Sequence, residues 1–360
     1  MNKRSCVTID ISRIVNNYKI LTALAKSGQQ IMPVIKANAY GHGDIKVATT
    51  LEKVGCSSFC VATIDEAIRL KENGIKSTIL ILGYTSSAFA KEIAKYGFHQ
   101  TIISKEHLIN FLKTGERICV HFKIDTGMHR VGFEPNTDTE KLIRNAAESL
   151  DIKGVYTHLC ASDDNEKRDF TLLQIDKFKG FCKRIGDLNL PFIHCFNTAG
   201  ALNFNDGFST HLRIGIALFG LAPCYSFPLP FGVLPALSWD TEVAMVKKVK
   251  KGESVGYGMS ETMQKDSVIA TLTTGYADGF SRALSCKGNV FINGKKARIV
   301  GKICMDQMMI DVTGINAKQG DRAMLLCDDY TADDMAKDIG TISYEITTRI
   351  TDRVSRIYKN

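Results

Sequence analysis

The chain has 360 residues, 44% of them hydrophobic and 23% charged, and a formal net charge of +8 at pH 7. This length exceeds what one ordinary core holds and predicts two domains, and the composition is that of a globular protein. The basic residues are scattered, and no basic run is interleaved with aromatic residues, which argues against nucleic acid as a partner.

Between residues 30 and 220, short β-branched runs alternate with longer amphipathic stretches. The stretches carry apolar residues at three- and four-residue spacing, which predicts helices, for example over 44–54, 64–73 and 170–185. Eight strands that alternate with helices predict an α/β fold with an N-terminal (β/α)8 barrel. A doubly wound open sheet is the alternative, but no Gly-x-Gly-x-x-Gly follows the first strand. The predicted strands span residues 31–36, 58–63, 78–83, 100–104, 119–125, 152–159, 192–197 and 211–217.

A proline-rich segment divides the chain. Residues 223–235 carry four of the seven prolines and predict a linker. The barrel is therefore expected over 1–222 and a second domain over 236–360. The second domain is expected to be mostly β, because strand-like runs alternate with glycine turns there and Asn293-Gly294 has the signature of a two-residue hairpin.

The second domain should contain one short helix, over 332–339. A further strand-like run, 5–11, joins either domain. The predicted strands of the β domain span 241–249, 267–273, 289–292, 297–303, 308–312 and 323–326.

One lysine stands at the end of the first predicted barrel strand. Residues 34–43 read Val-Ile-Lys-Ala-Asn-Ala-Tyr-Gly-His-Gly, so that Lys36 follows an apolar run and precedes a turn. A partly desolvated lysine amine at such a position can lose its proton and form a Schiff base with an aldehyde. The competing interpretation is a lysine that caps the strand and points to solvent.

Chemistry in barrels of this kind gathers at the C-terminal ends of the strands. Taken singly, His158, Arg130 and Lys123 have ordinary interpretations as a core histidine, a surface ion-pair partner and a snorkelling lysine. Their gathering at one end of a barrel favours an active site. Thr198 follows strand seven and strand eight runs into Gly215, in the region where barrels build phosphate sites. The candidate residues near the strand ends are Lys36, Lys123, Arg130, His158, Asn197, Thr198, Arg213, Gly215 and Ile216.

The segment around Lys36 resembles the pyridoxal-phosphate attachment site of the alanine racemase family, and the resemblance covers essentially the whole chain. It implies an isomerase, an amino-acid racemase, with pyridoxal 5'-phosphate as cofactor. Members usually have proline where Ile214 stands, and often tyrosine at Phe219. The other segments that resemble the family's are 124–130, 156–159, 213–220, 255–258, 274–279 and 301–307.

The resemblance also implies roles for single residues. Lys36 would hold the cofactor and Tyr40 would contact its phosphate. Arg130 would bind the substrate carboxylate, braced by Lys123, which is carbamylated in many members. The remaining implied cofactor-binding residues are His158, Asn197, Thr198, Arg213, Gly215 and Ile216, and the remaining implied substrate-binding residues are Met305, Tyr276 and Asp306.

Racemisation requires two acid/base groups on opposite faces of the substrate Cα, and the resemblance supplies Lys36 and Tyr257. His158 and Arg213 would favour the phenolate form of Tyr257, and Arg213 would also bond the pyridine nitrogen. In the family, Tyr257 and Met305 reach the barrel of a partner subunit, which implies a homodimer with shared active sites. No metal is expected.

Alanine is the expected substrate, with D-alanine supplied to cell-wall precursors. The alternative is L- and D-serine, because several segments also resemble the catalytic domains of vancomycin-resistance-type serine racemases. Many alanine racemases have a tyrosine where this chain has Asp352, which makes Asp352 a candidate for specificity. The serine-racemase-like segments are 58–63, 79–84, 157–161 and 283–286.

Two further classes share parts of this architecture. A barrel protein that only binds the cofactor would lack the β domain, and the barrel-fold decarboxylases use an acidic contact to the pyridine nitrogen, against which Arg213 argues. The eleven cysteines lack metal-site spacing and are expected to be reduced. With no signal peptide and no long apolar stretch, the chain is expected in the cytoplasm, or as a cytosol-facing catalytic domain of a membrane-anchored protein, with no membrane segment of its own.

Overall fold

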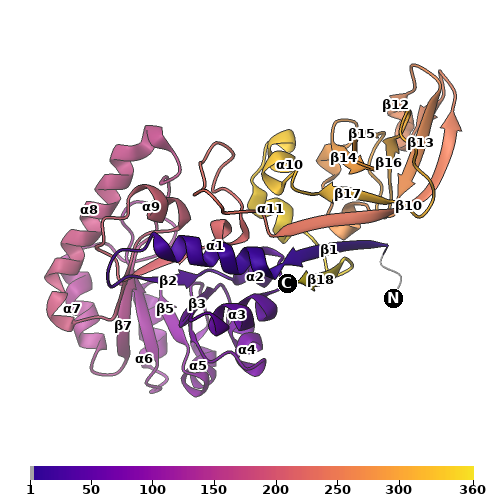
Figure 1. The fold of residues 1–360 in the computed structure, drawn as a ribbon. Coiled ribbons are helices and arrows are strands. Elements are labelled where there is room, and N and C mark those ends of the chain that lie inside the picture. The colour runs from indigo at the N-terminus through magenta and orange to yellow at the C-terminus, as the bar shows by residue number, and fades with distance from the viewer. Residues whose placement is uncertain (1–3) are drawn as a thin grey trace.

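The structure of the protein, a computed structural model, describes residues 4–360. It consists of an α/β barrel beside a domain built on a mostly antiparallel sheet (Figure 1), which confirms the predicted fold class. Within the described residues, none of the helices combines the length and apolar composition needed to cross a membrane.

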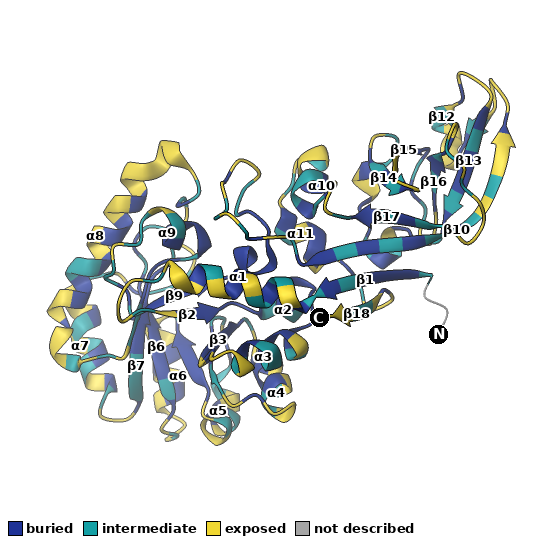
Figure 2. Ribbon diagram, viewed as in Figure 1, coloured by how far each residue is buried: buried dark blue, intermediate teal, exposed yellow. Residues whose placement is uncertain are grey.

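All eight predicted barrel strands are present, and most of their residues are buried (Figure 2). Their ends differ from the prediction because the chain leaves the ladder before the apolar run is over, so that β7 ends at Tyr156 and not at 159. The strands are β2 (Gln30–Pro33), β3 (Ser58–Val61), β4 (Thr78–Ile81), β5 (His99–Ile102), β6 (Cys119–Lys123), β7 (Asp151–Tyr156), β8 (Phe192–His194) and β9 (His211–Ile214).

The strands form one closed parallel ring. Strands β3 to β8 pair in chain order, and β2 pairs with β9. A bridge between Val34 and Cys60 joins β2 to β3. On the other side, the Arg213 amide donates to the carbonyl of Phe196 at 3.0 Å and closes the ring beside β8.

The helices cover the outside of this ring, as their apolar stripes predict (Figure 1). Helix α3, for example, buries Val47, Ala48 and Leu51. Helix α4 begins in a capping box in which Thr63 and Glu66 satisfy each other's backbone amides. The helices of this domain are α1 (Ile11–Ala23), α2 (Lys36–Tyr40), α3 (Asp44–Lys53), α4 (Ile64–Glu72), α5 (Ala90–Tyr96), α6 (Lys105–Leu112), α7 (Thr137–Ala146), α8 (Arg168–Arg184) and α9 (Thr198–Asn203).

The second domain is built on an eight-stranded sheet in the order β13-β16-β15-β14-β17-β10-β1-β18, with β10 also paired to β13. The six predicted strands and the predicted helix α10 are present, whereas helix α11, strand β18 and the small β11–β12 pair were not expected. The elements are β1 (Ser5–Asp10), β10 (Leu237–Val249), β11 (Ser254–Val255), β12 (Glu261–Thr262), β13 (Ser267–Leu272), β14 (Asn289–Ile292), β15 (Lys295–Val300), β16 (Met308–Asp311), β17 (Arg322–Leu326), β18 (Ser355–Lys359), α10 (Ala332–Ile339) and α11 (Ser343–Thr348). Short 3-10 turns lie at Ser87–Phe89, Asn165–Lys167, Gly186–Leu188, Ile216–Phe219, Tyr257–Met259, Tyr276–Asp278 and Arg282–Leu284.

The strand pairings show where residues 5–10 belong and whether the predicted hairpin forms. Strand β1 pairs with β10 and β18, so residues 5–10 belong to the sheet of the second domain although they precede the barrel in the chain. A boundary at 222 therefore leaves this strand on the wrong side. The Asn293-Gly294 hairpin is present, with both residues at positive φ between paired Ile292 and Lys295.

The C-terminal segment returns to the barrel and packs on the turn after Lys36. A Cβ at Gly41 would collide with the backbone carbonyl of Thr347, and one at Gly43 with the hydroxyl of Tyr358. Arg356 also donates from Nε to the Gly41 carbonyl at 2.9 Å. Glycine at 41 and 43 therefore allows α11 and β18 to approach closely, which ties the second domain to the segment that follows Lys36.

Candidate active site

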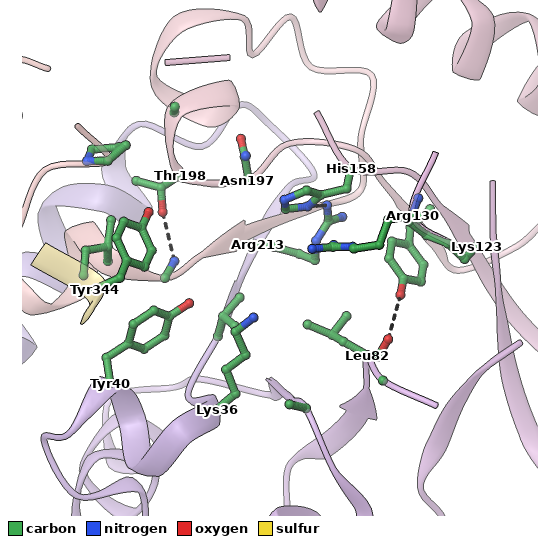
Figure 3. A pocket seen from close by; sticks show the side chains of 18 of the residues that line it. Lys36, Tyr40, Leu82, Lys123, Arg130, His158, Asn197, Thr198, Arg213 and Tyr344 are labelled. Carbon is green, nitrogen blue, oxygen red and sulfur yellow. Dashed lines mark hydrogen bonds between the residues drawn. The ribbon is translucent and has the colours of Figure 1, made fainter. Parts of the chain in front are cut away.

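The C-terminal ends of the barrel strands surround a cavity of about 560 Å³ (Figure 3). Its size and its mixed lining are typical of a small-molecule site. The structure brings together every site residue predicted at the barrel strand ends, and all of them line this cavity. These residues are Lys36, Tyr40, Lys123, Arg130, His158, Asn197, Thr198, Arg213, Gly215 and Ile216.

Lys36 follows β2 and points into the cavity (Figure 3). Burial lowers the pKa of its amine, and the charge of Arg130 lowers it further. The Lys36 amine therefore becomes neutral and nucleophilic at a lower pH than the amine of a surface lysine does.

The turn after Lys36 has an uncommon backbone. Four consecutive non-glycine residues, Ala37 to Tyr40, have φ between 51° and 54°. This left-handed conformation costs roughly 1–2 kcal/mol per residue, and surrounding contacts must hold it. The carboxylate of Glu66 accepts from the Ala37 amide at 2.6 Å, and buried His42 stacks on Phe219 with ring centroids 4.3 Å apart.

A small cradle lies beside Lys36. The Gly215 amide donates to the Thr198 hydroxyl at 3.0 Å, and a Cβ at Gly215 would stand only 2.6 Å from the Tyr40 hydroxyl. Asn197 shapes the turn by accepting from the Gly200 amide at 2.9 Å. Two hydroxyls and a side-chain-free backbone at one spot are donors suited to a phosphate, so a phosphate-bearing aldehyde fits between this cradle and Lys36.

Arg213 is a buried cation on β9. Its Nη atoms donate to the carbonyls of Thr157 at 2.7 Å and His194 at 2.9 Å, and to Nδ1 of His194 at 2.8 Å. Within residues 4–360, no carboxylate pairs with this guanidinium and its Nε has no acceptor. Nε is therefore free to donate to a ligand in the cavity.

His158 and Lys123 flank Arg213. Burial, together with the charge of Arg213, lowers the pKa of His158 well below its ordinary value, so His158 is neutral at pH 7. Burial, again with the charge of Arg213, lowers the pKa of Lys123 to about 7. Arg130 lines the same cavity and is exposed.

The predicted site residues of the β domain do not line the cavity of their own chain. Tyr257 lies between β11 and β12, at the end of the sheet far from the barrel (Figure 1), and is 70% exposed. Tyr276, in the 3-10 turn Tyr276–Asp278, and Met305 are also exposed. Asp306 forms an ion pair with Arg353 at 2.7 Å.

Asp352 does not reach the cavity either. Its side chain is fully exposed and lies 3.5 Å from Arg356. Within a single chain, this carboxylate therefore does not contact the cavity.

The sequence pattern did not predict several of the residues that line the cavity. Gly83 and Tyr84 follow β4, where the rule of strand ends could have found them. Tyr344 lies on α11, and Ile342 is the residue before that helix. No local sequence signal predicts that this segment covers the cavity.

Comparisons of sequence and of structure with known proteins point to the same family. A profile described as the N-terminal domain of alanine racemase matches residues 9–223, and one described as the C-terminal domain matches residues 236–358. A Clostridium perfringens protein named alanine racemase is 39% identical over 98% of this chain and 94% of its own length. An Enterococcus faecalis protein named amino-acid racemase is 38% identical over 98% of this chain, which spans 51% of that protein. The solved structure of an alanine racemase from Clostridium difficile 630 superposes with a TM-score of 0.94 at 32% identity, over 100% of this chain and 96% of that one.

Proposed function

Because the chain belongs to the alanine racemase family and is an amino-acid racemase, we propose that it interconverts L- and D-alanine with pyridoxal phosphate bound at Lys36. The observation that carries this proposal is the cavity itself. It combines a partly desolvated lysine, a cradle at Gly215 and a buried arginine with a free Nε. The D-alanine formed would supply cell-wall precursors.

Each part of the cofactor has a counterpart among these residues. Lys36 would hold its aldehyde carbon, and Tyr40, Thr198 and the Gly215 backbone would surround its phosphate. When bound, pyridoxal phosphate supplies an electron-withdrawing ring that makes the substrate Cα proton acidic.

Arg213 would set the electronics of that ring. A guanidinium does not release its proton, so Arg213 would donate from Nε to the pyridine nitrogen and leave that nitrogen unprotonated. By keeping that nitrogen unprotonated, Arg213 would favour prompt return of the proton to Cα over transamination.

Two groups would move the Cα proton on opposite faces. The Lys36 amine would hold or give a proton on one face, and the Tyr257 phenolate would do so on the other. Tyr257 lies far from the cavity of its own chain, so we propose that a second copy of the chain supplies it. Met305, Tyr276 and Asp306 of that copy would complete the substrate carboxylate site with Arg130.

Substrate preference is tested by assaying L-alanine and L-serine on the same purified protein. Alanine should be turned over faster. None of the relatives named above is named for serine, so the serine alternative depends on the sequence resemblance alone. Faster turnover of serine would overturn the alanine proposal and leave the racemase chemistry intact.

Lys36 should be the residue to which borohydride fixes pyridoxal phosphate. Its lowered pKa makes the amine available for the aldehyde, and the phosphate cradle lies beside it. Mass spectrometry of the digested protein would locate the label. Lys123 is the natural competitor, because its pKa of about 7 leaves about half of its amine neutral at pH 7. Label on Lys123 in place of Lys36 would refute the assignment.

Lys123 should take up carbon dioxide. Its neutral amine attacks the carbon of CO2, one proton leaves, and an N-carboxylate forms whose negative charge faces Arg213 and Arg130. Since only the neutral amine reacts, the carbamate should grow as the pH rises through about 7, the pKa of Lys123. Carbon-13 NMR in labelled bicarbonate would follow it.

The variant Lys123→Met should lack this carbamate signal, whereas Lys36→Met should retain it. A signal that is absent at every pH, or that survives in Lys123→Met, would contradict the proposal for Lys123.

A further inference from the structure

Three buried histidines run in a line through the barrel from the beginnings of the strands to Arg213. We call His99, His121 and His194 the histidine chain. Nδ1 of His99 lies 2.9 Å from Nε2 of His121, and Nδ1 of His121 lies 3.0 Å from Nε2 of His194. Nδ1 of His194 lies 2.8 Å from Nη1 of Arg213. Every link joins an Nδ1 atom to the next group along.

Arginine determines the direction of these hydrogen bonds. A guanidinium only donates, so Nδ1 of His194 must accept, and a neutral His194 then carries its proton on Nε2. That proton donates to Nδ1 of His121, which places the proton of His121 on Nε2 in the same way. The same step makes Nδ1 of His99 the final acceptor. One donor at Arg213 therefore orders three imidazoles.

The surroundings keep the histidine chain neutral. Burial lowers the pKa of His99 to about 4 and lowers the pKa values of His121 and His194 well below the ordinary value. The barrel also makes room for the rings, because a Cβ at Gly154 would stand 3.0 Å from Cε1 of His121. His99 keeps 7% exposure at the far end of the chain of rings.

We propose that Arg213 orders the tautomers of His194, His121 and His99, and that His99 is a positioning residue that holds the Arg213 guanidinium through the other two rings. Without an acceptor at position 99, the Nε2 proton of His121 has no partner. His121 can then shift its proton to Nδ1, where it opposes the Nε2 proton of His194. A matching shift in His194 would place an N–H group opposite the Arg213 guanidinium. The hydrogen bond from Arg213 to Nδ1 of His194 would then be lost. The role of Arg213 in catalysis rests on the proposed function, whereas the tautomers do not.

The tautomers are read directly by nitrogen-15 NMR of histidine-labelled protein, with the three residues assigned through single variants. At pH 7 all three should be neutral and protonated on Nε2. Protonation of any of them on Nδ1, or a positive charge on any of them, would overturn the inference, whether or not the protein racemises alanine.

The positioning role is tested with a pair of variants of similar volume. His99→Asn can place an amide oxygen near the former Nδ1 atom and keep an acceptor for His121, whereas His99→Leu removes it. In His99→Leu, the NMR signals of His121 and His194 should become mixtures of tautomers, and kcat for alanine should fall by about tenfold, the scale of one or two lost hydrogen bonds. In His99→Asn, both the tautomers of His121 and His194 and the value of kcat should stay close to those of the native protein.

His211→Leu is the matched control. His211 is also a buried imidazole, and its ring stacks on Phe192, which His99 and His121 contact too. Its hydrogen bond goes to Thr210 and not to the histidine chain. It should leave the tautomers unchanged. Unchanged tautomers in His99→Leu, or equal losses of kcat in the leucine and asparagine variants, would refute the positioning role. If the native protein itself does not racemise alanine, the proposed function fails while the NMR result still decides the tautomer order.

Discussion

Replacing Lys36 with alanine should reduce alanine racemisation by more than about 10⁴-fold, because under the proposed function the change removes both the covalent hold on the cofactor and one of the two proton-transfer groups. The lysine lies in the cavity between the phosphate cradle and Arg130, and its lowered pKa favours the neutral amine that both roles require. Steady-state kinetics on protein saturated with cofactor would measure the loss.

Lys71→Ala provides the comparison. Burial lowers the pKa of Lys71 as well, but its amine bonds to the carbonyls of Lys76 and Ser77 at the edge of the barrel, away from the cavity. That variant should keep native turnover. A Lys36→Ala protein that folds with a native melting temperature and retains one tenth of native turnover would remove Lys36 from the mechanism.

The barrel could be predicted because its pattern is local. Each parallel strand is a short run of β-branched residues that is buried on both faces, and each helix has an apolar stripe at its own period. The rule that barrel strands end at the site then located Lys36, Lys123 and His158 without knowledge of their contacts. Arg213 fitted that rule only partly, because it precedes most of the apolar run of the eighth predicted strand. What the run lengths could not give was the last residue of each strand.

The cover of the cavity could not be predicted in this way. Tyr344 lies on α11, about 300 residues after Lys36, and only packing brings it to the cavity. The left-handed turn over Ala37 to Tyr40 is equally hidden, because alanine ordinarily favours right-handed helix. Contacts from Glu66 and from the C-terminal segment hold that turn, and they become visible only in three dimensions.

The histidine chain could not be predicted from the sequence either. A lone histidine in a strand is most simply a buried core residue, and each of these three is buried in the core. Their meaning comes from their order across β5, β6 and β8, which the sequence separates by more than 20 residues at each step. Barrel closure places them one beside the next.

Replacing Tyr257 with phenylalanine should lower racemisation by roughly 10²–10⁴-fold, the range for one acid/base group. The loss must be equal in both directions because the two enantiomers have equal free energies. The two faces are separated by running the reaction in D2O and measuring deuterium at Cα in recovered L- and D-alanine. The enantiomer served by Lys36 should still exchange its Cα proton with retention of configuration, whereas the other should not. Equal exchange into both, or native racemisation, would exclude Tyr257 as the second base.

The position of Tyr257 predicts how two damaged chains should repair each other. This side chain is 70% exposed and lies outside its own cavity, so the proposed site, shared across a two-fold dimer, would take Lys36 from one chain and Tyr257 from the other. Unfolding and refolding a 1:1 mixture of Lys36→Ala and Tyr257→Phe chains should give hybrids with one intact and one doubly damaged site. Random pairing restores about a quarter of native activity, because half the dimers are hybrids and each has one good site of two. If Tyr257 acted within its own chain, every site would keep one defect and mixing would restore nothing.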